Sequence, residues 1–409
     1  MDSRINLNRL REDLEALSQF GRNAEGGVTR PSFSRADLEA RRWLKGRIES
    51  AGLAYRQDGA GNIFGRMGGN GGKVVMAGSH IDTVVNGGRF DGSVGVLAAL
   101  ECLRTIKERG LAVSKPLEAA AFTDEEGNLI GDFLGSRAFS GRLNEDDLRR
   151  GDTQLGPPLK EILVGTDFTI ESILRAREKA PALEAYLELH IEQGETLETE
   201  EVPIGVVEVI AGKHYRWCSF SGKTGHAGTV PLELRRDAFL GLADFALRAT
   251  RLVATEYYGS MITIGRVCVL PGTFSNIPGR ADFSLEFRNA DKNDLRDLEK
   301  VLFPLAEEVA ATRGLTFSSK IVDQTEPVVI PARIFGVIKA ECEKLGYPYI
   351  ALPSGPGHDA QILAFVTDVG MIFIPCLDGV SHSSQEMIRW DDLEKGANVL
   401  LQVLLRLAK

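Results

Sequence analysis

The sequence predicts an α/β protein: a larger domain with a mostly parallel central sheet, interrupted by a smaller ferredoxin-like α+β domain. Short apolar runs alternate with amphipathic helices over much of the chain, which is typical of a parallel sheet. In the middle of the chain the order changes to β-α-β-β-α-β. The length of 409 residues exceeds the ~100–200 residues of one ordinary domain. We therefore expect the larger domain over 1–211 and 327–409, and the inserted domain over 212–326.

Two helices are expected near the start of the chain. Residues 5–20 form the first helix, and Ser34 begins the second, where Ser34 and Asp37 fit a capping box. The apolar stripe of the second helix consists of Leu38, Trp43, Leu44 and Ile48. Such a stripe marks the side of a helix that packs against a core.

Four apolar runs predict the strands of the central sheet. They show no polar alternation, as expected for strands that are covered on both faces. They lie at 73–80, 117–123, 185–190 and 370–375. A helix over 94–110 separates the first two runs, and an amphipathic helix over 391–409 is the last element.

The inserted domain is predicted from the middle of the chain. Its expected elements are a strand at 214–222, a helix at 231–257, strands at 261–270 and 281–289, a helix at 292–314 and a strand at 315–322. This is the order of the split β-α-β arrangement.

Composition excludes several classes of protein. The formal net charge of −9 and the lack of a basic cluster argue against a nucleic-acid partner. No apolar run approaches the ~18–20 residues of a membrane span, so no membrane association is expected. The charged N-terminal segment lacks the apolar region of a signal peptide, and the five cysteines form no CxxC pair. We expect a cytoplasmic protein.

Histidines and carboxylates follow each of the four predicted strands. The carboxyl ends of parallel strands meet at one edge of a sheet, so these side chains should converge. The candidate metal ligands are His80, Asp91, Glu126, His190 and His382. Imidazole and carboxylate together suit Zn²⁺, Mn²⁺, Co²⁺ or Ni²⁺.

Two further residues have expected roles beside these ligands. Asp82 lies on the same strand face as His80 and could orient its imidazole by accepting a hydrogen bond. Glu125 lies beside the candidate ligand Glu126 and is free to act as general base on a metal-bound water. A lone strand-end histidine is more often structural, and a Glu-Glu pair is usually a solvated turn. The joint occurrence of four such clusters favours a metal site, because buried charges are costly unless they are paired or coordinated.

Seven motifs together resemble the hydantoinase/carbamoylase group of amidases, within the clan of co-catalytic zinc aminopeptidases and deacylases. They are GSHIDTVVNGGRFDG, TDEEGN, FLGSRA, ELHIEQG, HAGTVP, PSGPGHDA and DGVSH. The group includes N-carbamoyl-L-amino acid hydrolases, allantoate amidohydrolases and β-ureidopropionases. The resemblance implies a zinc-aminopeptidase-like catalytic domain, an inserted lid and dimerisation domain, and a homodimer.

The resemblance also implies two divalent metal ions per subunit, Zn²⁺ or Mn²⁺, with Co²⁺ or Ni²⁺ as further options. His80 and His190 would bind one ion, and Glu126 and His382 the other. Asp91 would bridge the two ions, and Glu125 would be the base and proton shuttle. Peptidases and acylases of the clan usually have an acidic residue in place of His190, so this histidine favours the carbamoyl-cleaving branch.

Other residues match substrate-contacting positions or loops of the group. They are Gln193, His226, Asn276, Arg288, Gly357 and His358. His226 would stabilise the developing oxyanion, often across the dimer. Asn276 and Arg288 would grip a substrate carboxylate, which the planar guanidinium binds bidentately. Allantoate-cleaving relatives often have a basic pair and an aromatic residue near His214, and here His214 either faces the pocket or lies on the lid surface.

The predicted reaction is hydrolysis of a ureido (N-carbamoyl) group on a carboxylate-bearing small molecule. An N-carbamoyl-L-amino acid is the favoured substrate, giving amino acid, CO2 and ammonia. Alternatives are an allantoate amidohydrolase, a β-ureidopropionase, an aminopeptidase or acylase of the clan, and a metal-bearing binding protein without catalysis. The intact Glu125 argues against the last. No GxSxG elbow is present, and the glycine-rich stretch at 68–72 precedes its strand, which does not fit dinucleotide binding.

Overall fold

The structure is a computed structural model that describes residues 3–69, 71–151, 153 and 156–409. The chain forms two compact units. Within the described residues, the first unit comprises Met1–Glu208, Ile330–Leu352 and His358–Lys409, and the second comprises Val209–Val329 and Pro353–Gly357. The segment expected as an insertion, 212–326, lies within the second unit, which extends three residues further at each end.

The described residues contain a sheet of nine strands in the order β1-β2-β4-β3-β5-β16-β6-β14, with β15 paired to β6. The strands are β1 (Ala54–Gln57), β2 (Ile63–Met67), β3 (Val74–His80), β4 (Leu117–Phe122), β5 (Leu183–Ile191), β6 (Ile204–Ile210), β14 (Val328–Val329), β15 (Tyr349–Ser354) and β16 (Val369–Ile374). The central strands β4, β3, β5 and β16 pair in parallel, and β2 and β6 flank them antiparallel. These central strands are the four apolar runs, so the prediction of a mostly parallel central sheet is confirmed.

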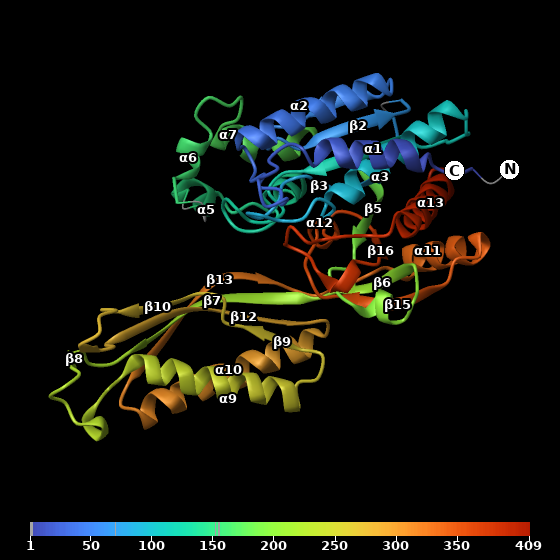
Figure 1. Cartoon of the computed structure of the whole chain (residues 1–409). Helices are drawn as coiled ribbons and strands as arrows, with labels where there is room; N and C mark the ends of the chain where they lie inside the picture. Colours follow the sequence, from blue (N-terminus) through green and yellow to red (C-terminus); the bar gives the residue numbers. More distant parts are fainter. Residues whose placement is uncertain (1–2, 70, 152, 154–155) are drawn as a thin grey trace. The chain divides into compact units, whose positions relative to one another are not determined.

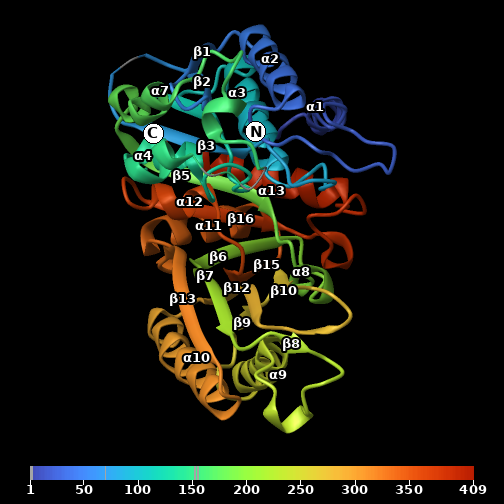
Figure 2. The same ribbon diagram turned by 90° about the vertical axis from the view of Figure 1, so that its left-hand side faces the viewer.

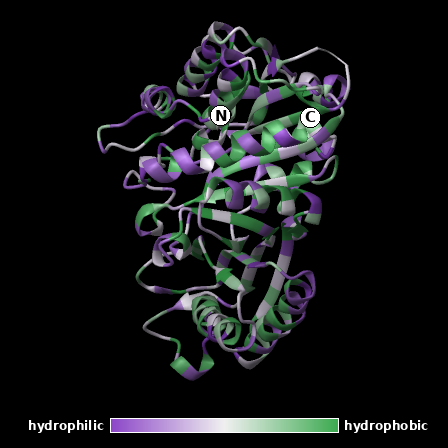
Figure 3. Cartoon of the chain, turned by 90° about the vertical axis from the view of Figure 1, so that its right-hand side faces the viewer, coloured by the Kyte–Doolittle hydropathy of each residue, from purple (hydrophilic) through white to green (hydrophobic). Residues whose placement is uncertain are grey.

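Helices cover the sheet of the first unit (Figure 1). They are α1 (Leu7–Leu17), α2 (Arg35–Ser50), α3 (Ser93–Glu108), α4 (Leu134–Ser140), α5 (Glu145–Arg150), α6 (Leu159–Ile162), α7 (Ile170–Leu174), α8 (Thr196–Thr199), α11 (Ala332–Leu345), α12 (Asp359–Leu363) and α13 (Trp390–Leu407). The strands are mostly hydrophobic, whereas outer helices alternate between hydrophilic and hydrophobic residues (Figure 3). That alternation is the pattern of helices with one buried face.

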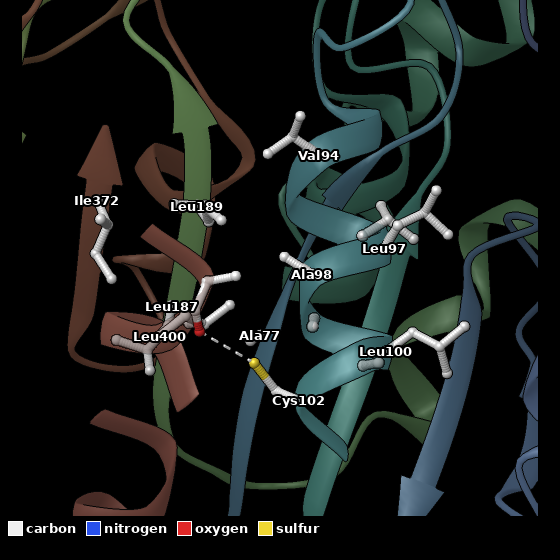
Figure 4. Close-up of a cluster of buried hydrophobic side chains, with 14 of the residues drawn as sticks. Ala77, Val94, Leu97, Ala98, Leu100, Cys102, Leu187, Leu189, Ile372 and Leu400 are labelled. Atoms are coloured by element: carbon white, nitrogen blue, oxygen red, sulfur yellow. Dashed lines mark hydrogen bonds between the residues drawn. The ribbon is translucent and has the colours of Figure 1, made fainter. Parts of the chain in front are cut away.

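The main core of the first unit lies between α3, α13 and the parallel strands. Figure 4 shows Val94 and Ala98 on the side of α3 that faces β5 and β16, and Leu97 and Leu100 on its other side. The labelled residues from these elements include Val94, Leu97, Ala98, Leu100, Leu187, Leu189 and Ile372. The Sγ atom of Cys102 lies 3.5 Å from the backbone oxygen of Ala397, which connects α3 to α13. This packing fixes the sheet whose strand ends bear the candidate ligands.

The second α helix begins at the predicted cap, with one difference in detail. The hydroxyl of Ser34 accepts the backbone N–H of Asp37, as a capping box requires. The Asp37 carboxylate, however, accepts the N–H of Phe33, not that of Ser34. It also pairs with Arg41 one turn later. Phe33 has a positive φ of 63°, which turns its N–H towards the helix.

The second unit has the predicted ferredoxin-like topology. Its elements are β7 (Gly212–Ser221), β8 (Gly225–His226), α9 (Ala238–Glu256), β9 (Met261–Thr263), β10 (Val267–Leu270), β11 (Asn276–Ile277), β12 (Arg280–Asn289), α10 (Lys292–Thr312) and β13 (Thr316–Thr325). The main sheet has the antiparallel order β10-β12-β7-β13, with β9 also paired to β12. Helices α9 and α10 cover one of its faces (Figures 1 and 2). Among the described residues, no helix combines the length and apolarity that crossing a bilayer requires.

Candidate metal centre

The candidate ligands lie where the parallel strands end. His80 is the last residue of β3, and its register partner is Phe122, the last residue of β4. Glu125 and Glu126 follow three and four residues later. His190 is one residue from the end of β5 and pairs in register with a residue of β16. Parallel register therefore brings these segments to one edge of the sheet, as expected.

Asp91 lies between two groups of candidate ligands. Its Oδ1 atom is 3.7 Å from Nε2 of His80 and 3.1 Å from Nε2 of His190. Its Oδ2 atom is 3.2 Å from Nε2 of His382, which is also 3.4 Å from Oε2 of Glu126. One carboxylate thus presents its two oxygens to two different sets of donors. The described residues include both sets as groups with spacing suited to a metal ion.

The buried imidazoles are oriented by backbone carbonyl groups. Nδ1 of His80 lies 3.0 Å from the carbonyl oxygen of Asp82, and Nδ1 of His190 lies 2.9 Å from that of Ile191. A carbonyl only accepts, so each Nδ1 carries the proton and donates it. The Nε2 lone pairs are then directed towards Asp91, the orientation that a metal-binding histidine needs.

The loop that holds Asp91 passes very close to these rings. Gly92, the N-cap residue immediately before α3, has a positive φ of 60°, and a Cβ atom there would lie 2.4 Å from the His80 imidazole. The N–H of Gly92 donates to Nε2 of His190 at 3.2 Å. Glycine is therefore required at this position both by the backbone conformation and by the close approach.

The Asp82 carboxylate was expected to orient the His80 imidazole, but it binds backbone N–H groups instead. It is 3.8 Å from Nδ1 of His80, beyond hydrogen-bond distance. Instead, its two oxygens accept the backbone N–H groups of Glu125 and Glu126, at 3.4 and 3.3 Å. Asp124, just before them, has a positive φ of 55°. Asp82 thus holds the turn that carries both glutamates.

Glu125 is buried close to the ligands. Its Oε2 atom lies 3.6 Å from Nε2 of His80. Burial raises the pKa of its carboxyl well above the ordinary value, and the neighbouring Glu126 carboxylate raises that pKa further. A carboxyl that gains a proton readily, next to a site for a polarised water, is suited to general base chemistry.

The charges of the site are closely coupled. Burial raises the pKa of Glu126 to about 8. The hydrogen bond with Asp91 raises the pKa of His382 to about 9. Burial opposes ionisation of Asp91, but the attraction of the three neighbouring histidines outweighs burial and holds its pKa well below the ordinary value. So many carboxylates at one buried place favour cations, whether protons or metal ions.

Gln193 and His358 also lie at this edge of the sheet. Nε2 of Gln193 donates to Oδ2 of Asp91 at 2.9 Å and to Oγ of Ser381 at 3.1 Å. The buried ring of His358, which follows Gly357 and immediately precedes α12, packs 4.5 Å from the His190 ring, centroid to centroid. Gln193 is thus placed to orient the Asp91 carboxylate.

In the second unit the structure brings two predicted substrate contacts together. His226 in β8 is the register partner of Asn276 in β11. The His226 side chain is exposed, and its Nδ1 accepts the N–H of Gly228 at 3.1 Å. Their side-by-side placement is suited to holding one small polar group.

Arg288 and His214 lie on opposite faces of the main sheet of this unit. His214 pairs in register with Phe287 and faces α10, where its Nδ1 is 3.4 Å from Glu299. Burial lowers the pKa of His214. Arg288 lies on the face opposite to that of α9 and α10, bonded to Glu286 and 3.5 Å from the hydroxyl of Tyr215. The sheet position thus favours Tyr215 over His214 as a neighbour of Arg288.

Sequence reasoning did not assign Ser381 and Glu386. Oγ of Ser381 lies 3.2 Å from Oδ2 of Asp91 and 3.0 Å from Oε2 of Glu386. Glu386 is buried, although it lies in the polar sequence SHSSQE, which gives no sign of burial. The only sequence feature that could have pointed to these two residues is their closeness to the candidate ligand His382.

Comparison with known proteins identifies the family. The sequence model of the family described as peptidase family M20/M25/M40 matches residues 76–406 of this chain, which include every candidate metal ligand. The chain belongs to this family. It is 36% identical over 405 residues to an N-carbamoyl-L-amino acid amidohydrolase of Geobacillus stearothermophilus, covering 98% of each chain. It is 33% identical to an allantoate amidohydrolase of Escherichia coli, covering 98% of this chain and 97% of the other.

Solved structures show to which group within the M20 family this chain belongs. A hydantoinase/carbamoylase family amidase from Burkholderia vietnamiensis matches with a TM-score of 0.89 and 32% identity, covering 100% of this chain and 99% of the other. The chain is therefore a member of the hydantoinase/carbamoylase amidases, as the motifs predicted. It is a hydrolase of non-peptide C–N bonds in a family of metal-dependent enzymes.

Proposed function

We propose that this M20 family member is a dimetal amidohydrolase that cleaves the ureido C–N bond of a carboxylate-bearing small molecule. The favoured substrate is an N-carbamoyl-L-amino acid, and the products are the amino acid, CO2 and ammonia. The observation that carries the proposal is the position of Asp91. Its Oδ1 faces His80 and His190, and its Oδ2 faces His382. This is the arrangement that a carboxylate bridging two ions requires.

The donor set fits two divalent ions. His80 and His190 would hold one, Glu126 and His382 the other, and Asp91 both. Nitrogen and oxygen donors suit Zn²⁺ or Mn²⁺, and Co²⁺ or Ni²⁺ are also compatible with them. The ions, when bound, supply Lewis-acid activation of water and of the substrate carbonyl. The buried carboxylates support the assignment, because cations must compensate their charge.

Side chains of the protein carry out proton transfer and hold the catalytic groups in position. Glu125 accepts a proton from the attacking water, whose oxygen forms a bond to the ureido carbon. The C–N bond then breaks as Glu125 returns that proton to the leaving nitrogen, and the carbamic acid that remains decomposes to CO2 and the second amine. Asp82 holds Glu125 in place through the Glu125 backbone N–H. Gln193 keeps the Asp91 carboxylate oriented.

Residues of the second unit bind and polarise the substrate in this proposal. Arg288 pairs with the substrate carboxylate through its planar guanidinium, and Asn276 adds an amide contact. His226, the register partner of Asn276, donates to the developing oxyanion. His358, after Gly357, supports the ring of His190. His214 has no direct substrate contact in this proposal, because it faces Glu299 of α10 and lies on the other sheet face from Arg288.

We further propose a homodimer formed through the second unit. This unit exposes several large apolar side chains, which a partner surface could cover. They include Leu232, Leu234, Phe239, Leu240, Leu247 and Phe274. A second copy would bury them. We place the enzyme in the cytoplasm, where a reducing environment keeps its cysteines as thiols, the state of those described.

An allantoate amidohydrolase is the second candidate. The identity to the allantoate-cleaving relative, 33%, is close to the 36% of the carbamoyl amino acid relative. The contact between Tyr215 and Arg288 also places an aromatic hydroxyl beside the proposed carboxylate-binding residue. A β-ureidopropionase would use the same chemistry, and an aminopeptidase or acylase would release amine without ammonia.

Ammonia release tests the proposal. The protein is stripped with chelator, reloaded separately with Zn²⁺, Mn²⁺, Co²⁺ or Ni²⁺, and given allantoate, a panel of N-carbamoyl-L-amino acids, N-carbamoyl-β-alanine and dipeptides. Chelator-sensitive ammonia from the N-carbamoyl-L-amino acids is expected. Turnover of allantoate alone selects the second candidate, and amine release from dipeptides without ammonia overturns the ureido chemistry.

A further inference from the structure

Glu386 has a position that the proposed mechanism does not use. It lies in the loop before α13, and its side chain is 1% exposed. Its Oε1 atom accepts two backbone N–H groups, from Phe90 at 2.7 Å and from Asp91 at 3.1 Å. Its Oε2 atom accepts the hydroxyl of Ser381 at 3.0 Å. One carboxylate therefore binds both the loop that carries Asp91 and the loop that carries His382.

The glycine-rich loop is built around this carboxylate. A Cβ atom at Gly88 would lie 2.0 Å from the Glu386 carboxyl carbon, so the loop passes directly over it. Residues 81–90 contain no helix or strand. Backbone hydrogen bonds between Gly87 and Val28 hold the middle of this loop, and at its end Glu386 binds the backbone of Asp91 itself.

The hydroxyl of Ser381 connects Glu386 to the Asp91 carboxylate. A hydroxyl has one proton, and here it has two acceptors within reach, Oε2 of Glu386 and Oδ2 of Asp91. Gln193 donates to both Asp91 and Ser381. If a cation held Oδ2 of Asp91, the Ser381 hydroxyl would donate its hydrogen bond to Oε2 of Glu386 instead. Glu386 thus keeps Ser381, and with it the adjacent His382, in place while Asp91 is occupied.

We propose that Glu386 is a positioning residue that sets the distance between Asp91 and His382 and so preorganises the metal centre. This inference rests on the proposed dimetal function. Without Glu386, part of the metal-binding free energy must order the two loops, so metal binds more weakly. The contacts of Glu386 are with the loops that carry Asp91 and His382, so we expect the loss to fall on metal affinity and kcat, not on KM.

Metal titration against a competing chromophoric chelator tests the inference, using the full-length protein and Zn²⁺. Glu386→Ala is expected to weaken metal binding by about 10–100-fold, the usual effect of removing an outer partner of a ligand. Glu386→Gln keeps an acceptor for the two N–H groups and is expected to lose less than Glu386→Ala. Activity of Glu386→Ala should recover as the metal concentration is raised, with KM unchanged.

Glu101→Gln is the matched control. Glu101 is also fully buried and also accepts a backbone N–H, that of Asn6, but it packs α3 against α1. It should lower thermal stability and leave metal affinity unchanged. Wild-type metal affinity in Glu386→Ala overturns the inference. If that variant does not fold, Glu386→Asp decides, with unchanged affinity again overturning it.

The two proposals fail in different ways. A wild-type protein that binds no metal, or that releases no ammonia once loaded, removes the proposed function. A wild-type protein that binds metal and turns over substrate, beside a Glu386 variant with equal affinity, removes only the role of Glu386.

Discussion

The Nδ1 atom of His80 donates its hydrogen to the backbone carbonyl of Asp82, two residues along the chain. This bond orients the imidazole without using the Asp82 carboxylate. The carboxylate is then free to accept the backbone N–H groups of Glu125 and Glu126. One strand end of three residues therefore positions a candidate ligand through its backbone and the candidate base through a side chain.

Replacement of Asp82 should separate these two roles. In Asp82→Asn the amide keeps one acceptor, while its NH2 group opposes the second backbone N–H. We expect kcat to fall by about 10–100-fold, because Glu125 loses part of its support. Metal affinity should change less, since the carbonyl that orients His80 remains. Chelator competition beside steady-state kinetics measures both, and a larger loss of metal affinity than of kcat contradicts this reading.

Glu125→Gln should remove the base while leaving the metal centre assembled. The amide has nearly the same shape but cannot accept a proton, so kcat should fall by roughly 10²–10⁴-fold. Metal content, measured by elemental analysis, should equal that of the wild-type protein. Glu126→Gln is the contrasting variant, since it should lose metal as well as activity. A nearly wild-type rate in Glu125→Gln would exclude Glu125 as the base.

Arg288→Ala should lower kcat/KM for substrates that carry a free carboxylate. Loss of a bidentate charged contact should cost about 1.5–3 kcal/mol, or roughly 10–100-fold in kcat/KM. The corresponding neutral amides should be affected much less. Arg280→Ala is the matched control, because Arg280 lies on the same strand, exposed and paired with Asp282. An equal loss on acids and neutral amides contradicts the role of Arg288.

Removal of metal should make stability depend on pH. The pKa of His382 is raised from 6.5 to about 9, so protonation of this residue stabilises the folded metal-free protein. That contribution is complete below pH 6.5 and is lost as the pH rises through 9. Glu126, with its pKa raised from 4.5 to about 8, acts in the same direction, since its ionisation costs more in the folded state.

Thermal unfolding from pH 6 to pH 9 checks this expectation. The Tm of the metal-free protein should fall as the pH rises, and the increase in Tm on adding Zn²⁺ should grow, because metal and protons compete for the same groups. His382→Ala should flatten the pH dependence of the metal-free protein. A stabilisation by metal that shrinks with rising pH would contradict the assignment.

Local sequence patterns predicted most of the fold. The unalternating apolar runs became β3, β4, β5 and β16, because burial on both faces of a parallel sheet requires such runs. Ser34 caps α2 as predicted. The β-α-β-β-α-β order gave the topology of the second unit. Strand order in the larger sheet did not follow from any of these patterns, since it depends on contacts distant in sequence.

The candidate metal ligands were also predictable in kind, because histidines and carboxylates recur at strand ends. Their partners were not. Asp82 binds backbone N–H groups of a different strand end, and Glu386 binds a loop almost 300 residues earlier in the chain. His214 faces a helix, which its sequence neighbours did not indicate. Each of these contacts joins segments whose separation is set by the folded chain.

The sequence by itself determined which side chains are available for chemistry and on which elements they lie, because hydrophobic period, caps and turns are local properties. Only the tertiary structure decided that the two oxygens of Asp91 face different histidines and that a buried Glu386 binds the loop that carries Asp91. The physical reason is that distances of a few ångströms between remote segments are fixed by packing of the whole core, and no local pattern encodes them.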